Sequence, residues 1–446
     1  MKLKELLNHP CGFAGLFSRM EIGSAYARAC LLATEMMTGC EPLRAAYREL
    51  KAYRNAVSLP ENRLAVELLS QKLQSLKDIH TTLDRLGGGE TLDDIEWYEV
   101  KYLGMLSSEV RQLLEKLHLA EVTKVPDLEK VVEALDPDGL HIATFYVYDS
   151  YSEELAQLRA ESRRSAVFDE ELFLKINALE EQVRARLSAS LRGESALLRE
   201  AQQILAQTDI LLAKARLMLN ENFSIPEFYD EGSTEYRQMF HPEVKAALAG
   251  EGKNYTLVDI AFGGRPVLII GANMGGKTVV LKTLALCQFL CQFGFGVPAA
   301  QARVALKEEV CFCIGDHQSI TEGLSSFASE MRQIDALIRL ARQGSKVLAL
   351  LDEPARTTNP TEGTALVRAL LPILSTPQTD VLIATHYVIP FDGKHRCLKV
   401  KGLENGSMNY TLTEVNEGEV PLEALNIATQ LGVDPEWIRE AEKFVR

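Results

Sequence analysis

Hydrophobic residues recur at helical spacing through the first half of the chain. Three stretches, 152–166, 169–190 and 195–220, are rich in Leu, Ala, Glu, Arg and Gln. In the second stretch an apolar residue returns about every 3.5 positions, as in helices that pack side by side. The residues that recur are Leu172, Ile176, Leu179, Val183 and Leu187. The pattern predicts long helices, arranged either as a coiled-coil-like arm or as an ordinary bundle.

The pattern changes between about residues 254 and 415. Apolar runs at 267–270, 347–351 and 381–384 are typical of buried parallel strands, and helical patterns follow the strands. Residues 397–415 alternate like an antiparallel hairpin, and a last helix is predicted from Pro435 to Val445. We therefore predict a fold of class α + α/β. A helical domain would cover residues 1–235, with residues 222–242 as the boundary, and an α/β domain would cover residues 236–446.

Composition narrows the class of protein. The chain has 446 residues, of which 46% are hydrophobic and 25% charged, and this excludes a disordered chain or a small disulfide scaffold. No run reaches the roughly 18 apolar residues that a membrane span needs, and residues 1–10 lack a signal-peptide core. We expect a cytoplasmic protein with no membrane partner. Its net charge of -14 offers nucleic acid no overall attraction.

A glycine-rich segment lies between a predicted strand and a predicted helix. It matches G-x-x-x-x-G-K-[ST] in full and consists of Gly271, Ala272, Asn273, Met274, Gly275, Gly276, Lys277 and Thr278. In such a loop the backbone N–H groups converge on phosphates, and the helix N-terminus adds positive potential. We expect ATP here, with Lys277 at the β- and γ-phosphates and Thr278 on Mg²⁺.

Polar residues end the next two predicted strands. Asp352 and Glu353 follow the apolar run 347–351. Beside a phosphate-binding loop, Asp352 would hold Mg²⁺ and Glu353 would polarise the attacking water, although a carboxylate pair can also cap a strand. His386 comes just after the run 381–384. It would either face the γ-phosphate or lie in the core. Ser325, at the predicted start of a helix, fits either an N-cap or an anion contact.

Four segments in order resemble the MutS mismatch-repair ATPases. They are the glycine-rich segment, residues 323–331 (the signature helix), residues 351–363 (Walker B and the loop after it) and residues 384–387 (the switch segment). The resemblance implies an ABC-like ATPase that works as a dimer. It places Ser325 on the partner subunit's γ-phosphate, Asn273 near the γ-phosphate and Tyr255 against adenine. Weaker likeness covers most of the N-terminal part.

Several features depart from that family. We find no mismatch-reading domain with its Phe-x-Glu, no connector domain, no room for a β-rich clamp between residues 152 and 220, and no Smr-type nuclease domain after Arg446. Thr-Thr-Asn-Pro follows Walker B where Gly-Thr-Ser-Thr is usual, and Leu324 stands where a basic residue is common. The ATPase segments therefore look intact, while the DNA-handling parts look reduced.

These observations leave the target open. The family resemblance implies an ATP-switched clamp on mismatched or branched DNA. The reduced build resembles instead the reactivating ATPase of cobalamin-dependent lysine 5,6-aminomutase, which would remodel a protein client. The aromatic run 145–151 is either a partner surface or core. A scaffold with little turnover is a third reading, against which Glu353 and His386 argue.

Overall fold

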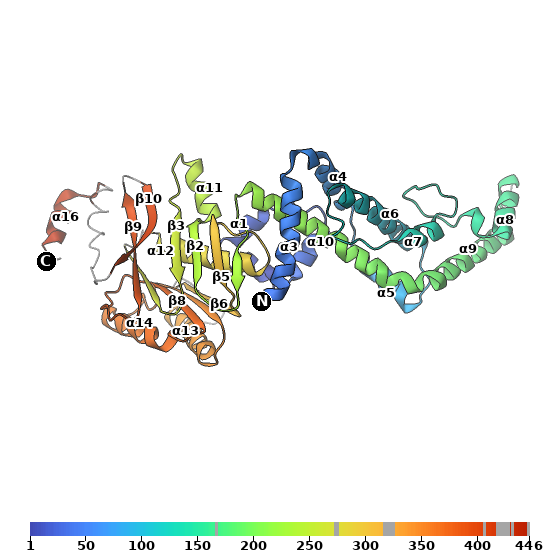
Figure 1. Cartoon of the computed structure of the whole chain (residues 1–446). Coiled ribbons are helices and arrows are strands. Elements are labelled where there is room, and N and C mark those ends of the chain that lie inside the picture. The colour runs from blue at the N-terminus through green and yellow to red at the C-terminus, as the bar shows by residue number, and fades with distance from the viewer. Residues whose placement is uncertain are drawn as a thin grey trace. The chain divides into compact units, whose positions relative to one another are not determined.

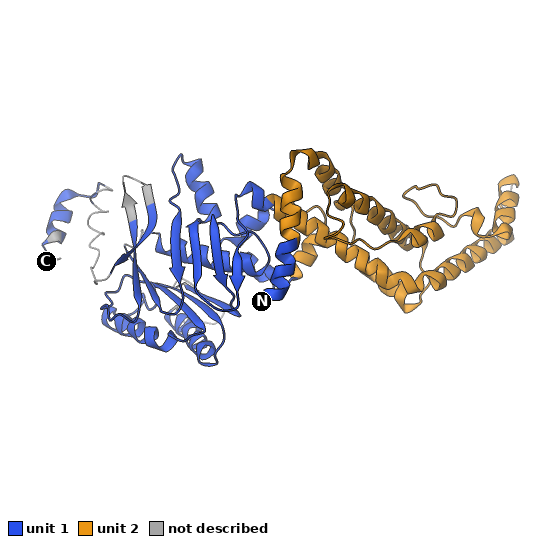
Figure 2. Cartoon of the chain, viewed as in Figure 1, with its two compact units in different colours: residues 1–20, 34–48, 217–446 blue, residues 21–33, 49–216 orange. Residues whose placement is uncertain are grey.

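The computed structural model describes residues 1–165, 168–271, 276–314, 326–404, 407–415, 429 and 432–443. These residues form two compact units (Figure 2). Unit 1 comprises residues 1–20, 34–48 and 217–446, and unit 2 comprises residues 21–33 and 49–216. The chain crosses from one unit to the other inside α3 (Cys40–Ser58) and α10 (Ser195–Asn220). The units are thus discontinuous along the chain, and the predicted domain division near residue 235 stays a prediction.

A six-stranded sheet dominates unit 1. Its strands are β4 (Val267–Ile270), β6 (Glu309–Ile314), β7 (Val347–Asp352), β8 (Thr379–Ala384), β9 (Arg396–Glu404) and β10 (Ser407–Val415). They lie in the order β10-β9-β4-β8-β7-β6, and all neighbours are parallel except β9 and β10. The predicted parallel strands and the terminal hairpin are therefore confirmed.

Three helices pack against this sheet. They are α12 (Lys277–Gln292), α13 (Ser326–Arg342) and α14 (Pro360–Leu374), and each follows a parallel strand (Figure 1). Apolar side chains of α13 and α14, among them Leu337 and Val367, share one buried cluster with Leu268 of β4 and Leu351 of β7. Unit 1 is therefore an α/β unit whose core lies under the parallel strands.

A second sheet completes unit 1. Its strands β1 (Glu227–Tyr229), β2 (Thr234–Met239), β3 (Val258–Phe262) and β5 (Gln301–Ala305) lie in the order β1-β5-β2-β3. The sequence pattern described residues 222–242 only as a boundary and missed β1 and β2. Both strands are short, and β1 and β2 pair with β5, which is distant in the sequence. Local patterns carry little information about such pairings.

Helix α12 lies between the two sheets. Almost all its side chains are buried, as expected of a helix enclosed on every side. It packs against β7 and β8, and on its other side Gln288 donates a hydrogen bond of 3.0 Å to the carbonyl of Ala305 in β5. Because α12 begins at Lys277, this packing fixes the position of Lys277 and Thr278. The remaining helices of unit 1 are α1 (Phe13–Ser18), α11 (Pro242–Gly250) and α16 (Pro435–Glu442).

Unit 2 is helical. Besides parts of α3 and α10 it holds α2 (Ala25–Ala33), α4 (Arg63–Leu73), α5 (His80–Gly88), α6 (Asp94–Lys116), α7 (Glu129–Leu135), α8 (Glu153–Arg164) and α9 (Glu170–Leu191). The three long helices predicted between residues 152 and 220 are confirmed as α8, α9 and α10. Ser152 and Asp169 cap α8 and α9 by accepting hydrogen bonds from backbone N–H groups of the first turn.

A buried lysine holds the aromatic run 145–151 in unit 2. Lys101 of α6 is fully buried, and its Nζ lies 3.0 Å from Asp136 Oδ1, 3.0 Å from the Tyr148 hydroxyl and 3.1 Å from the Thr144 carbonyl. Phe145 and Tyr148 are buried, whereas Tyr146 is 44% exposed. The run therefore contributes Phe145, Val147 and Tyr148 to the core, while Tyr146 and Ser150 are exposed.

None of the helices in the described part of the chain combines the length and the apolar composition that crossing a membrane requires.

Candidate functional site

Parallel pairing brings the predicted site residues to one edge of the six-stranded sheet. Strands β4, β8 and β7 are neighbours, so their carboxyl ends lie together, the usual place for a ligand in an open α/β sheet. Backbone hydrogen bonds join these ends: Thr385 N–H donates to Ile269 at 3.0 Å, and Glu353 N–H donates to Ala384 at 2.8 Å. The ends of the three strands are therefore joined to one another by backbone hydrogen bonds.

The described part of the glycine-rich segment frames the start of α12. Gly271 and Gly276 have φ values of 145° and 83°, which favour glycine. Ala272, Asn273, Met274 and Gly275 lie outside the described residues, as does Ser325.

Lysine and threonine from the first turn of α12 reach the carboxylates. The buried Lys277 donates a hydrogen bond of 2.7 Å to the carbonyl of Gly271, and its Nζ lies 3.5 Å from Glu353 Oε1. The Thr278 hydroxyl donates to Asp352 Oδ2 at 2.7 Å. The structure thus brings Lys277, Thr278, Asp352 and Glu353 together, and their roles stay a prediction.

Asp352 is a buried carboxyl with one unused oxygen. Its Oδ1 is shielded from solvent and has no hydrogen-bond partner among the described residues. Burial, and to a smaller extent the charge of Glu353, raise its pKa, while the hydrogen bond from Thr278 lowers it. An unpaired carboxylate oxygen beside a threonine hydroxyl suits a hard divalent cation such as Mg²⁺, so the residues present fit that ion.

Glu353 sits at a strained point directly after β7. Its φ is 49°, in the left-handed region, which costs a residue other than glycine about 1–3 kcal/mol. Its Oε2 lies 3.6 Å from Arg356 Nη1 and 3.7 Å from His386 Nδ1. His386 is exposed, so the core interpretation of this histidine does not hold.

Tyr255 lies near the glycine-rich segment but is paired with another ring. Its ring stacks on that of Tyr410, with centroids 5.0 Å apart, and its hydroxyl accepts a hydrogen bond from the His241 N–H at 3.2 Å. Burial raises the pKa of Tyr255 to about 12. A Cβ atom on Gly276 would lie only 2.2 Å from the Tyr410 ring, so this ring packs directly on the segment. Sequence reasoning missed Tyr410, because its strand carries only an alternating pattern.

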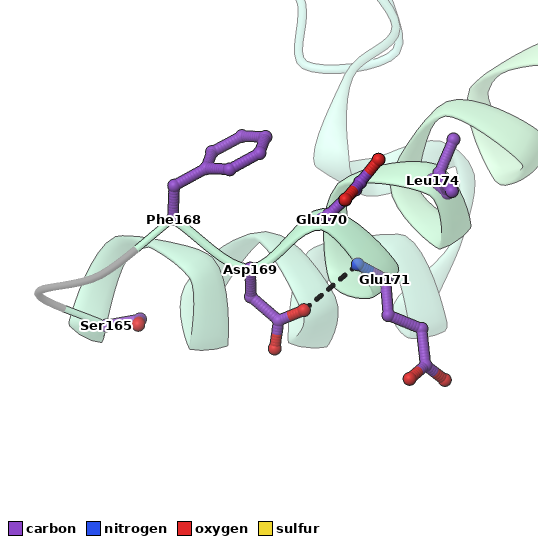
Figure 3. Close-up of a pocket in the computed structure, with 6 residues that line it drawn as sticks. All are labelled: Ser165, Phe168, Asp169, Glu170, Glu171 and Leu174. Carbon is purple, nitrogen blue, oxygen red and sulfur yellow. Dashed lines mark hydrogen bonds between the residues drawn. The ribbon is translucent and has the colours of Figure 1, made fainter.

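The end of the α8–α9 hairpin in unit 2 carries exposed apolar side chains (Figure 3). Phe168 is 74% exposed and Leu174 59% exposed, and both line a shallow pocket with Asp169, Glu170 and Glu171. The Asp169 carboxylate accepts a hydrogen bond of 3.0 Å from the Glu171 N–H (Figure 3). This surface, which we call the hairpin tip, therefore combines apolar groups with carboxylates.

The fold and the site define a mixed helical and α/β protein with a polar site at the carboxyl edge of its larger sheet. Residues 267–417 match the family model for MutS domain V. The chain is 32% identical over 285 residues to a protein named Endonuclease MutS2 from Agathobacter rectalis, in an alignment that covers 62% of this chain and 35% of the relative. It is 34% identical over 239 residues to Endonuclease MutS2 of Streptococcus pneumoniae, covering 53% of this chain and 28% of that protein. The family-model match and these relatives support membership of the MutS family, and the matched region spans about a third of these relatives.

The raised pKa of Asp352 leads to a first prediction. The folded state holds the proton more tightly than the unfolded state, so ionised Asp352 destabilises the fold as pH rises above about 4. Asp352→Asn removes this charge, and we expect the variant to melt at a higher temperature than wild type at pH 7 without nucleotide or divalent ions. The gain should shrink as pH falls toward about 4.

Thermal unfolding followed by circular dichroism across this pH range measures the effect. Asp335→Asn, which changes an exposed carboxylate on α13, is the control and should show little change. A variant that is less stable than wild type at every pH would contradict the electrostatic account.

Proposed function

We propose that this chain is an ATP-binding and ATP-hydrolysing switch whose α/β unit is an ABC-like P-loop domain. The observation that carries the proposal is the meeting of Lys277, Thr278, Asp352 and Glu353 at the carboxyl ends of adjacent parallel strands. A loop that binds phosphate, a lysine, a hydroxyl and two carboxylates are the groups that nucleotide hydrolysis requires.

The site residues have distinct roles in this proposal. Lys277 exchanges its hydrogen bond to Gly271 for one to a phosphate oxygen. Thr278 and Asp352 hold Mg²⁺, which supplies positive charge to the phosphate oxygens when it is bound. Glu353 accepts a proton from the water whose oxygen attacks the γ-phosphorus, as the bond to the ADP oxygen breaks. His386 orients that water, and the rings of Tyr255 and Tyr410 offer a stacking surface for adenine.

The family resemblance supports mismatched or branched DNA as the target and a dimer as the working form. The relatives are named endonucleases, but their alignments cover 28–35% of their length, and nuclease activity forms no part of this proposal. The hairpin tip favours a second candidate, a protein client such as an aminomutase. Its exposed Phe168, Phe173 and Leu174 suit an apolar protein surface, and its carboxylates repel phosphates.

Two substitutions separate binding from hydrolysis. Lys277→Ala should abolish ATP binding, because it removes the only positive side chain that the proposal places at the phosphates. Glu353→Gln should bind ATP as wild type does and hydrolyse it at least about 100-fold more slowly. A fluorescent ATP analogue measures binding, and phosphate release measures hydrolysis.

Lys346→Ala is the matched control. Lys346 immediately precedes β7, so it lies at the amino end of the strand that Asp352 ends. Its Nζ donates a hydrogen bond of 2.9 Å to the Asp230 carbonyl. This variant should keep both binding and hydrolysis. Unchanged hydrolysis in Lys277→Ala would exclude the proposed site.

A mixed dimer tests whether Ser325 completes the partner's site. The family resemblance puts Ser325 on the γ-phosphate that the other subunit binds. Ser325→Ala and Lys277→Ala should each be inactive as homodimers, whereas a heterodimer of the two retains one intact composite site. We expect partial hydrolysis to return on mixing. If heterodimers form, shown by mass spectrometry of differently sized tags, and no hydrolysis returns, the site lies within one subunit.

A titration distinguishes the two targets. If DNA is the target, a duplex with a mismatch should raise the rate of ATP hydrolysis at about 50 mM salt, and the stimulation should weaken at about 150 mM because phosphate contacts release counterions. The matched duplex and the Phe168→Ser, Phe173→Ser double variant are the controls. The protein client would be favoured if DNA leaves the rate of ATP hydrolysis unchanged, an aminomutase changes that rate, and the double variant no longer shows this change.

A further inference from the structure

The loop after Asp352 contains a second residue in a left-handed conformation. Ala355 has a φ of 61°, in addition to the φ of 49° at Glu353. Residues with a Cβ atom rarely adopt this conformation and keep it only where surrounding groups hold them. Ala355 lies two residues after Glu353, so the contacts that hold Ala355 also constrain the loop that begins at Glu353.

Two buried side chains hold the backbone of Ala355 from opposite sides. Glu330 of α13 accepts a hydrogen bond of 3.2 Å from the Ala355 N–H. The Tyr387 hydroxyl donates a hydrogen bond of 2.8 Å to the Ala355 carbonyl. Glu330 is 6% exposed and Tyr387 is 7% exposed, so water competes little for either bond. Both polar groups of one strained residue are thus held by other elements of the fold.

Neighbouring residues hold the two side chains in place. The Tyr387 N–H donates to the Thr385 hydroxyl at 3.0 Å, which ties the tyrosine to the end of β8. A Cβ atom on Gly363 of α14 would lie 2.3 Å from the Tyr387 hydroxyl oxygen, so a glycine is needed there to admit the ring. Burial raises the pKa of Glu330, and its hydrogen bond from Ala355 opposes that rise.

We infer that Glu330 and Tyr387 are positioning residues, which fix Ala355 and through it aim the Glu353 carboxylate. The inference rests on the proposed function, in which Glu353 accepts the proton of the attacking water. Glu330 lies in the first turns of α13 and within residues 323–331, the segment that resembles the signature helix. The position of α13 is therefore coupled to the position of the proposed base.

Substitutions that remove single groups test the inference. Tyr387→Phe keeps the ring and removes only the hydroxyl, and it should lower kcat for ATP hydrolysis about tenfold. KM for ATP should stay near that of wild type, because Lys277 and Thr278 are untouched. Glu330→Ala should have a similar effect, and Glu330→Gln, which keeps an acceptor oxygen, should restore most of kcat.

A second change separates positioning from general stability. Glycine adopts a positive φ without the penalty that alanine bears, so Ala355→Gly should lessen the need for the Tyr387 hydroxyl. We expect the double variant Ala355→Gly, Tyr387→Phe to regain at least half of the kcat that Tyr387→Phe loses. A merely structural role for the hydroxyl predicts no such rescue.

Tyr47→Phe is the matched control. Tyr47 is a buried tyrosine of unit 1 whose hydroxyl also donates to backbone carbonyls, those of Cys291 and Phe295, near the end of α12 that lies away from Lys277. This variant should lower the melting temperature and leave kcat unchanged.

The outcomes separate the inference from the proposed function. A wild-type protein that neither binds nor hydrolyses ATP would overturn the proposed function and the inference with it. Hydrolysis that survives Tyr387→Phe and Glu330→Ala unchanged, or a loss of kcat that Ala355→Gly does not restore, would overturn the inference alone. Reduced kcat at constant KM with rescue by Ala355→Gly would support it.

Discussion

The parallel pairing of β4 with β8 and of β8 with β7 decides where the polar residues of unit 1 meet. These strands are buried on both faces, and their apolar side chains fix the register, with Leu268 opposite Ile383 and Leu350 opposite Leu382. Asp352 ends β7, while Gly271 and Thr385 directly follow β4 and β8, and the shared direction of the strands places all three ends at one edge. A change in register by one residue would move Asp352 away from Thr278 and break the hydrogen bond between them.

Several charged side chains are buried at the carboxyl ends of these strands. Lys277, Asp352 and Glu353 are all less than 9% exposed, and a buried charge costs free energy unless it is paired. Lys277 and Arg356 both lie close to Glu353, whereas Asp352 accepts its hydrogen bond from the uncharged Thr278 hydroxyl. Burial raises the pKa of Asp352, and its Oδ1 has no hydrogen-bond partner among the described residues. Ionised Asp352 lowers the stability of the free protein, and a bound cation would offset this cost. The Mg²⁺ proposal and the stability of the free protein are therefore linked.

Sequence patterns revealed the parts of the fold and site that depend on neighbours along the chain. Apolar runs marked β4, β7 and β8, and the spacing of Lys277 and Thr278 from Gly271 marked the loop, because strand, loop and helix are consecutive. The four-stranded sheet escaped notice, since β2 and β5 pair across a long stretch of chain. Tyr410 escaped for the same reason. Its contact with Gly276 joins β10 to the start of α12, which is distant in the sequence, and no local spacing records this contact.

The arginines of the α8–α9 hairpin illustrate how far charge counts can mislead about a target. Arg159 is paired with Asp149 and Glu180, and Arg184 lies within 3.1 Å of both Asp94 and Glu181. Such arginines hold helices together, and recruiting them to phosphates would break those pairs. The carboxylates at the hairpin tip add to this, because Asp169 and its neighbours already satisfy the helix start and repel an anion. Arg159 and Arg184 are therefore already engaged by carboxylates within unit 2, whereas Phe168 and Leu174 at the hairpin tip are exposed apolar side chains.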